Sequence, residues 1–359
     1  MPMILAGIGT ALPPHGVSQS DAAAITRRFS CETADQERLF QTFYRRAGVE
    51  NRHCVVLDSS DGDLAQRQSF YDTVPPTTLD RMRKYEQEAP RLALAASKSA
   101  LEDAGLVPGR VTHLITVSCT GFSAPGFDIS LIKQLNLSRE VSRTHVGFMG
   151  CHGVLNALRA GKAYVEADPA ARVLICAVEL CSLHHHYGWD TGQIVANALF
   201  ADGAAAVVGA ASAPNLTQTP LQLVMSGSVL IDDSEDAMSW RIGDHGFVMT
   251  LSSKVPDLIG GHLRAWIESW LMRQGMTLGD VGSWAVHPGG PRILSAVIEG
   301  LGLSRSALAV SQAILADQGN MSSATILFIL DRLRRAQVPR PCVVLGFGPG
   351  LAVEAALLA

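Results

Sequence analysis

The clearest pattern in this chain is a series of short, almost wholly apolar runs that alternate with longer segments of helical spacing. The apolar runs are typical of buried strands and occupy residues 3–9, 113–118, 172–177, 284–286, 343–345 and 353–358. The segments with helical spacing occupy residues 86–104, 126–135, 257–273, 293–300 and 322–335. Strands that alternate with helices in this way predict an α/β architecture in which helices cover both faces of a sheet.

The second half of the chain repeats the style of the first. In each half, a turn bounded by glycine places one reactive or polar residue at the start of a helix: Cys151 in the first half and Asn320 in the second. The stretch 211–222, rich in Ser, Ala, Pro, Asn and Thr, is the best candidate for a linker. We therefore predict a structural duplication, with halves at residues 1–212 and 213–359.

The composition narrows the class of protein. With 359 residues, 47% of them hydrophobic and 17% charged, and a formal net charge of -4, the chain has ample core and no basic surface for nucleic acid. It contains no run of about eighteen apolar residues and no leader pattern, so we expect a cytoplasmic protein without membrane insertion. The seven cysteines lack paired Cys-x-x-Cys spacing, which argues against a disulfide framework and against a zinc site.

One cysteine is placed as a nucleophile would be. In Gly150-Cys151-His152-Gly153 the glycines permit a tight turn between a strand and a helix whose first turn is expected to contain Cys151. Free N–H groups and the positive end of the helix dipole would favour a thiolate there. The plain alternative is a small buried hydrophobic residue, and this stretch alone does not decide between the two.

Three further glycine-rich turns carry chemistry. His287 follows the strand at 284–286 and precedes a Pro-Gly-Gly turn expected to expose it, Asn320 precedes a helix, and the loop at 346–350 is dense in glycine. Each has a plain explanation by itself: a core histidine, a helix N-cap and an ordinary turn. Together with Cys151 they suggest one pocket with a nucleophile and two hydrogen-bond donors.

These four motifs, Phe148-Met149-Gly150-Cys151-His152-Gly153, His287-Pro288-Gly289-Gly290-Pro291, Gly319-Asn320-Met321-Ser322-Ser323-Ala324 and Gly346-Phe347-Gly348-Pro349-Gly350, occur in an order that resembles the type III polyketide synthases, the chalcone and stilbene synthase family. The resemblance extends over nearly the whole chain and is nearer to bacterial than to plant members. It implies a duplicated thiolase fold of five alternating layers, αβαβα, and an obligate homodimer. It also implies acyl-CoA and malonyl-CoA as substrates, with no metal or prosthetic group.

The resemblance also assigns roles to the catalytic residues. Cys151 matches the family nucleophile, and His287 and Asn320 match its two partners, which would stabilise the enolate left when malonyl-CoA loses carbon dioxide. An imidazolium at His287 would lower the pKa of the Cys151 thiol. Gly348 and Gly350 of the last loop are expected to shape an oxyanion hole, and Ser322 to lie among the substrate-binding residues.

Two residues correspond to the gate between the coenzyme A tunnel and the cavity. Phe200 matches the first of the family's two gate phenylalanines. The second falls on Met249, where a flexible thioether replaces an aromatic ring.

Four cavity positions depart from the chalcone synthase pattern. Cys119 and His184 stand in place of threonines, Ala124 replaces a larger methionine near the dimer interface, and Trp240 replaces a glycine. Each substitution has a plain packing explanation. Our hypothesis is that Trp240 narrows the cavity and Ala124 opens a channel for a long aliphatic starter, giving an alkylresorcinol or an alkylpyrone.

Several alternatives stay open at this point. They are a condensing enzyme like ketoacyl synthase III that performs one extension, a type III synthase with an aromatic or malonyl starter, and a catalytically silent thiolase-fold binding module. The run His184-His185-His186 suggests a metal site only weakly, because adjacent residues on an extended chain face opposite ways. Starter length, number of extensions and the mode of ring closure are not set by the sequence.

Overall fold

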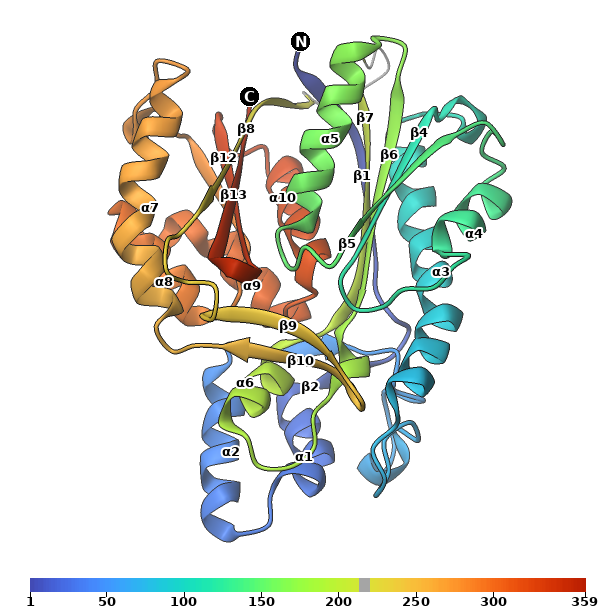
Figure 1. Ribbon diagram of the computed structural model, residues 1–359, viewed down its shortest axis with the longest axis vertical. Coiled ribbons are helices and arrows are strands. Elements are labelled where there is room, and N and C mark those ends of the chain that lie inside the picture. Colours follow the sequence, from blue (N-terminus) through green and yellow to red (C-terminus); the bar gives the residue numbers. More distant parts are fainter. Residues whose placement is uncertain (213–219) are drawn as a thin grey trace.

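The computed structural model describes residues 1–212 and 220–359 (Figure 1). The predicted boundary between the halves, and most of the predicted linker at 211–222, lie outside the described residues. The last two linker positions belong to a strand, β8 (Leu221–Leu230).

Nine strands of the described residues form one mixed sheet, and most of their side chains are buried. Their spatial order is β11 (Ser283–Val286), β12 (Cys342–Gly348), β13 (Ala352–Leu358), β8, β1 (Met3–Ala11), β7 (Asp202–Ala210), β6 (Arg172–Leu180), β4 (His113–Ser118) and β5 (Ser142–Gly147). All six apolar runs of the sequence are strands of this sheet. The sequences of these strands are apolar with little alternation because other parts of the protein cover both of their faces.

The strand order confirms the duplication. In the first half, β4 pairs with β6 in parallel, β6 with β7 antiparallel, and β7 with β1 antiparallel. In the second half, β11 and β12, β12 and β13, and β13 and β8 repeat these three relations. The halves join where Met3–Leu5 of β1 pairs with Leu221–Leu223 of β8.

Helices form the other layers. In the centre lie α5 (Gly153–Ala167) and α10 (Thr325–Arg335), whose apolar side chains share one core with residues of both half-sheets (Figure 1). The outer face of the first half is covered by α3 (Thr78–Asp103) and α4 (Phe127–Gln134). The outer face of the second half is covered by α7 (Val255–Met272) and α8 (Pro291–Leu301). The five alternating layers expected of this chain are therefore present.

The remaining elements gather at one end of the layers. Figure 1 shows the N-terminal helices, α6 and the β9–β10 hairpin at its lower end. They are β2 (Gly16–Ser18), α1 (Gln19–Ser30), α2 (Ala34–Arg46), β3 (Asn51–His53), α6 (Thr191–Leu199), β9 (Met238–Gly243) and β10 (Gly246–Leu251), with α9 (Ala309–Gln318) between them and the core. None of the described helices is both long and apolar enough to cross a membrane.

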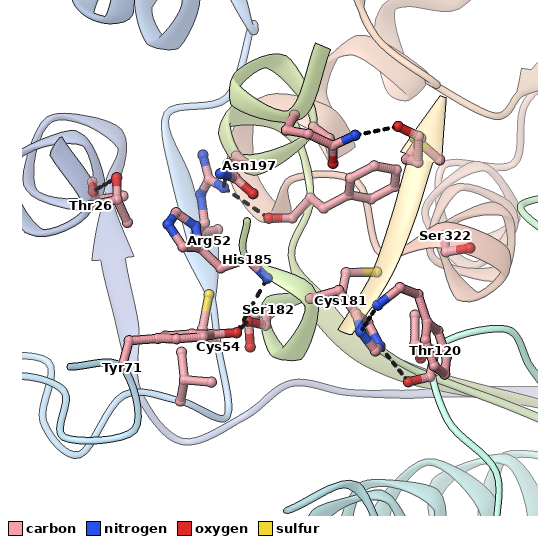
Figure 2. A pocket seen from close by; sticks show the side chains of 18 of the residues that line it. Thr26, Arg52, Cys54, Tyr71, Thr120, Cys181, Ser182, His185, Asn197 and Ser322 are labelled. Atoms are coloured by element: carbon pink, nitrogen blue, oxygen red, sulfur yellow. Dashed lines mark hydrogen bonds between the residues drawn. The ribbon is translucent and has the colours of Figure 1, made fainter. Parts of the chain in front are cut away.

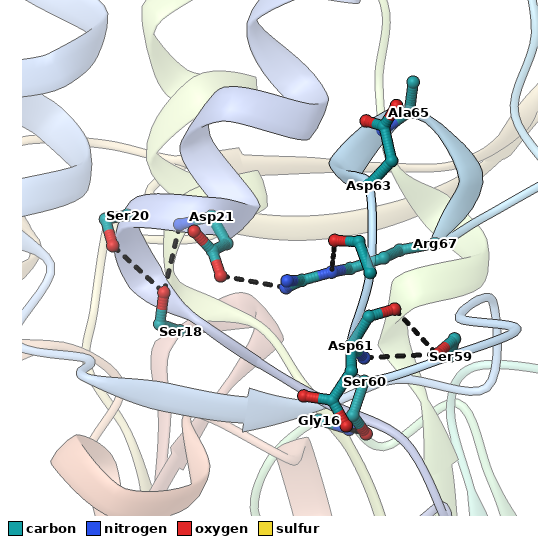
Figure 3. Close-up of polar contacts among 11 residues, drawn as sticks. Gly16, Ser18, Ser20, Asp21, Ser59, Ser60, Asp61, Asp63, Ala65 and Arg67 are labelled. Carbon is teal, nitrogen blue, oxygen red and sulfur yellow. Dashed lines mark hydrogen bonds and ion pairs between the residues drawn. The ribbon is translucent and has the colours of Figure 1, made fainter.

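A capping hydrogen bond and an ion pair hold the N-terminus of helix α1 in place. The Ser18 hydroxyl accepts a hydrogen bond from the backbone N–H of Asp21 at 3.1 Å, which caps the helix, and Arg67 forms an ion pair with Asp21 at 2.9 Å (Figure 3). Nearby, the Gly16 N–H donates to the Ser60 hydroxyl at 3.1 Å. These contacts fix α1 against the loop that precedes α3.

The helix α3 is longer than its apolar pattern predicts. It begins at Thr78 instead of residue 86, because Thr77 and Asp80 form a capping box and the polar residues that follow continue the helix. Pro90 lies inside it. The first turns of α3 are rich in charged residues, and one of their buried positions is Arg81, so hydrophobic periodicity does not predict them.

Candidate active site

Cys151 lies in a strained turn between β5 and α5. Gly150 has φ +79°, and a Cβ at that position would lie 2.3 Å from Cδ of Pro349. Phe148 also has a positive φ, +59°. Because α5 begins at Gly153, the nucleophile candidate precedes the helix, and the expectation that it belongs to the first turn is wrong by two residues.

Asn320 occupies the corresponding position before α10. Its backbone N–H donates to the carbonyl of Leu199 at 2.9 Å, and its own carbonyl accepts from the N–H of Ala201 at 2.9 Å, so that it pairs with Phe200. The side-chain oxygen accepts from the Ser322 N–H at 2.9 Å. In the described part of the chain, the side-chain nitrogen of Asn320 is buried and has no hydrogen-bond partner.

His287 follows β11, and its N–H donates to the carbonyl of Leu345 at 2.8 Å. The Pro-Gly-Gly turn does not expose the ring, as the sequence led us to expect, because the imidazole is buried with 1% of its surface accessible. Neither ring nitrogen has a hydrogen-bond partner among the described residues. The site therefore holds unused hydrogen-bonding capacity of the kind that a reacting oxygen would satisfy.

Ser322 links the two catalytic turns. Its N–H donates to Asn320, and its hydroxyl lies 3.6 Å from the sulfur of Cys151 and 3.1 Å from that of Cys119. Ser322 has φ +45°, a conformation that a serine adopts at an energetic penalty. His287 lies close enough to His152, the neighbour of Cys151, for the two rings to interact electrostatically.

Burial controls the protonation of the site. It raises the pKa of the Cys151 thiol to about 12, and the hydrogen bond from Ser322 opposes that rise only in part. It lowers the pKa of His287 to about 3, and the neighbouring His152 lowers it further. Cys151 is therefore a thiol and His287 a neutral imidazole near pH 7, contrary to the expected thiolate and imidazolium, because desolvation outweighs the helix end.

The glycine loop at 346–350 makes room for a side chain. A Cβ at Gly348 would lie 2.3 Å from Cδ2 and 2.5 Å from Nε2 of His152, and one at Gly346 would lie 3.1 Å from the Cβ of His152. Gly350 has φ +78°, and no described atom lies within 4 Å of its ideal Cβ position. The expected part of Gly348 and Gly350 in an oxyanion hole stays a prediction.

Cys151 lines a cavity of about 1100 Å³, its open mouth included. Figure 2 shows this pocket. It brings together most of the residues that the sequence placed in the pocket, namely Cys119, Cys151, His184, Phe200, Trp240, Met249 and Ser322. Ala124 is not among the lining residues and is exposed, so the single chain gives no support to a channel opened at Ala124. Gly348, Gly350, His287 and Asn320 are also outside the lining.

The histidine run makes separate contacts. His184 donates from Nε2 to the Thr120 carbonyl at 2.6 Å and accepts at Nδ1 from the Phe247 N–H at 3.0 Å, which fixes its tautomer. His186 contacts the carbonyl of its neighbour Tyr187 at 3.2 Å, and His185 packs among aromatic rings. No group of three potential metal ligands occurs in residues 1–212 and 220–359.

Glu179 is a site residue that the sequence reasoning missed. This buried carboxylate accepts hydrogen bonds from the Cys119 N–H at 3.0 Å, the Thr120 hydroxyl at 2.7 Å and the Ser323 hydroxyl at 2.5 Å, and burial raises its pKa. It thereby holds the β4 end against the turn after Asn320. The available signal was a single acidic residue at the end of an otherwise apolar strand run.

Comparison with known proteins identifies the family. The N-terminal domain profile of chalcone and stilbene synthases matches residues 1–213, and the C-terminal domain profile matches residues 222–359. The alpha-pyrone synthesis polyketide synthase-like Pks18 of Mycobacterium tuberculosis is 33% identical over 99% of this chain and 90% of its own length. The 1,3,6,8-tetrahydroxynaphthalene synthase of Streptomyces peucetius is also 33% identical, over 99% of this chain and 92% of its own.

Solved structures agree with this assignment. A polyketide synthase, PKS-I, of the brown alga Ectocarpus siliculosus superposes with a TM-score of 0.94 at 30% identity, covering 99% of this chain and 98% of its own. The C-terminal type III polyketide synthase domain of Steely1 from Dictyostelium superposes with a TM-score of 0.91 at 27% identity, covering 100% and 99%. The expected thiolase-like fold is confirmed. The chain belongs to the chalcone and stilbene synthase family and is a type III polyketide synthase, an acyltransferase that uses coenzyme A thioesters.

Proposed function

We propose that this synthase extends a fatty acyl-CoA starter with malonyl-CoA, by repeated decarboxylative condensation, and closes the product to an alkylresorcinol or an alkylpyrone. The observation that carries the proposal is the large, mainly apolar cavity that begins at Cys151. The Mycobacterium tuberculosis relative Pks18, which matches almost the whole chain, is named for alpha-pyrone synthesis. This supports the same product class.

In the loading step, Cys151 attacks the carbonyl carbon of the starter thioester. The acyl group moves from the sulfur of coenzyme A to that of Cys151, and the thiol proton leaves as the new bond forms. A neutral His287 suits this step, because an imidazole with a free ring nitrogen can accept the proton and then return it to the departing coenzyme A thiolate.

In the extension step, the unused donors of His287 and Asn320 stabilise the enolate. Leaving one buried polar group unpaired costs about 1–3 kcal/mol, so these groups are poised to gain when an anionic oxygen forms between them. The enolate carbon then attacks the carbonyl carbon of the acyl-Cys151 thioester, the bond from that carbon to the Cys151 sulfur breaks, and the extended chain leaves on coenzyme A. Removing either donor should slow extension on the order of a hundredfold or more.

A synthase that takes an aromatic or malonyl starter is the second candidate. It is favoured by the tetrahydroxynaphthalene synthase, whose named product carries no alkyl chain and whose identity to this protein is also 33%. The two candidates differ in the starter that Cys151 accepts.

A starter panel separates them. Purified enzyme is given malonyl-CoA with acyl-CoA thioesters from acetyl to stearoyl, with aromatic acyl-CoA thioesters, or alone, and the products are identified by mass spectrometry. We expect alkyl-bearing resorcinols or pyrones from the medium and long chains. Turnover of aromatic starters or malonyl-CoA alone, with no fatty product at any length, would refute the fatty-acyl assignment, and Cys151→Ala provides the blank.

Trp240 gives a second test of the pocket. Its ring nitrogen donates to the Cys119 carbonyl at 2.7 Å, so the indole stands beside the catalytic end of the cavity. Trp240→Gly should change the ratio of ring-closed products or the number of extensions. An unchanged product profile would remove Trp240 from the determinants of specificity.

We also propose that the protein functions as a homodimer without metal or prosthetic group. The strand β5 lies at the end of the sheet order, with β4 as its pairing partner, and the exposed side chains of Phe122, Phe148 and Met149 lie beside that edge. Light scattering should give twice the chain mass, and activity should survive a strong chelator. A monomer of full activity would contradict the first part, and a chelator-sensitive enzyme the second.

A further inference from the structure

The cavity continues well beyond the residues around Cys151. Its far part lies beneath α1 and is lined by the apolar side chains Val17, Ala22, Ile25, Phe29, Val56 and Leu57. Figure 2 shows Thr26, Cys54 and Tyr71 on one side of the cavity, with Thr120 and Ser322 on the other. We call this far part the α1 compartment, and none of the pocket residues deduced from the sequence belongs to it.

The rings of Trp240, His184 and Phe247 form a rigid part of the cavity wall. Trp240 donates to the Cys119 carbonyl, and both ring nitrogens of His184 are hydrogen bonded, one to Thr120 and one to Phe247. His184 stacks on Phe247 with 4.2 Å between ring centroids, and Trp240 meets both rings edge-on. A chain attached to Cys151 therefore meets fixed side chains on this side.

The α1 compartment offers a ligand little but apolar surface. The Tyr71 hydroxyl donates to the Ser182 carbonyl at 2.6 Å, and the Thr26 hydroxyl donates to the Ala22 carbonyl at 2.7 Å. Two nitrogens of its described lining, Arg52 Nε and His185 Nε2, have no partner, but both are covered by neighbouring atoms. A phenol or a carboxylate would lose its hydration there without gaining a partner, whereas methylene groups would not.

We propose that the α1 compartment binds the distal methylenes of the starter while its carbonyl is held on Cys151. This inference rests on the proposed fatty-acyl function and adds where the tail lies. Cys151 and the compartment line one continuous cavity, so a bound chain can reach it. Each methylene that enters should raise kcat/KM about fourfold, until the compartment is full.

A matched pair of substitutions on α1 tests the location. Ala22→Phe places a ring in the compartment, and Ala24→Phe places the same ring on the exposed face of the same helix. With Ala22→Phe, kcat/KM for the longest accepted starter should fall at least tenfold, with the optimum moved to shorter chains and short starters within twofold of wild type. Ala24→Phe should keep the wild-type profile.

A second variant covers the case in which Ala22→Phe fails to fold. Ile25→Ala enlarges the compartment and should move the optimum to longer chains. A direct map uses dodecanoyl-CoA with a terminal diazirine, whose photolabel should land on residues 16–30 or 54–57. Labelling at 119–124 or 240–247, or equal chain-length profiles for the Ala22 and Ala24 variants, would overturn the inference.

The result with wild-type enzyme distinguishes a failure of the proposed function from a failure of the proposed tail location. If wild-type enzyme accepts no fatty acyl-CoA, the proposed function fails and the tail location fails with it. If wild-type enzyme accepts fatty starters but the α1 variants leave the profile unchanged, only the location fails.

Discussion

Replacing Arg52 by methionine should loosen the turn that carries the first gate residue. Arg52 is buried on β3, and its Nη1 donates to the carbonyls of Asn197 and Phe200, both at 2.8 Å. Its Nη2 donates to the carbonyl of Ala198 at 2.5 Å and to the side-chain oxygen of Gln19. The guanidinium thus occupies the C-terminal end of α6, where the helix dipole favours a cation.

The magnitude follows from what methionine leaves behind. The Ala198 carbonyl keeps a donor, the side-chain nitrogen of Gln19 at 3.0 Å, but the carbonyls of Asn197 and Phe200 lose the donor described above. The two carbonyls are partly buried, so leaving both unsatisfied costs at most about 2–6 kcal/mol. Removing the buried charge of Arg52 offsets part of this loss, so we expect the free energy of unfolding to fall by about 2–4 kcal/mol.

The catalytic effect should accompany the loss of stability. Phe200 pairs with Asn320 through the backbone, so a loosened α6 end displaces the amide that we propose stabilises the enolate. Decarboxylation of malonyl-CoA should therefore slow at least tenfold at a temperature where the variant is fully folded. Urea unfolding followed by tryptophan fluorescence measures the first quantity, and release of carbon dioxide measures the second.

The control is Arg38→Met on α2, where the side chain is 82% exposed. It should change stability by less than about 0.5 kcal/mol. If Arg52→Met matched this control in stability, the assigned role of the buried guanidinium would be wrong. If it lost stability but kept the decarboxylation rate, the link to Asn320 would be wrong.

Three other outcomes follow from the site. Gly348→Ala should lower the melting temperature and reduce activity at least tenfold, because its methyl group would overlap the ring of His152, whereas Gly109→Ala, which meets no described atom within 4 Å, should behave as wild type in both assays. Alkylation of Cys151 by iodoacetamide should accelerate about tenfold per pH unit between pH 7 and 9, because its pKa lies far above that range; a plateau near neutral pH would show a thiolate instead. Ser322→Ala should slow that alkylation at every pH, since losing a hydroxyl that stabilises the thiolate raises the thiol pKa, and faster alkylation would reverse this reasoning.

The fold was largely predictable because its core is regular. The runs at 113–118 and 172–177 are mostly apolar and almost wholly buried, as is typical of strands covered on both faces, and both are strands of the sheet. The helix α6 and the β9–β10 hairpin were not found, because they are only partly buried and show no clean period. These three elements all contribute side chains to the cavity.

The candidate site also has features that the sequence predicts and features that it does not. The sequence predicts the glycine-bounded turns that carry Cys151 and Asn320, because backbone requirements are local; the catalytic roles of the two residues stay predictions. The protonation of Cys151 and His287 depends on burial by segments far away in the sequence, so local pattern gave the wrong sign. The contribution of α1 to the cavity was hidden for the same reason, since the local sequence does not show which distant segments lie opposite Ala22 and Ile25.

The backbone pairing of Phe200 with Asn320 has a consequence for timing. The backbone hydrogen bonds of Asn320 are made with Leu199 and Ala201, the two neighbours of Phe200. On the proposed roles, the backbone that carries the gate residue cannot shift without displacing Asn320. Opening for each new malonyl-CoA is then left to the other side of the passage, where Met249 has a flexible side chain on a two-stranded hairpin. Substrate admission and bond formation would therefore alternate, with the methionine moving and the phenylalanine standing still.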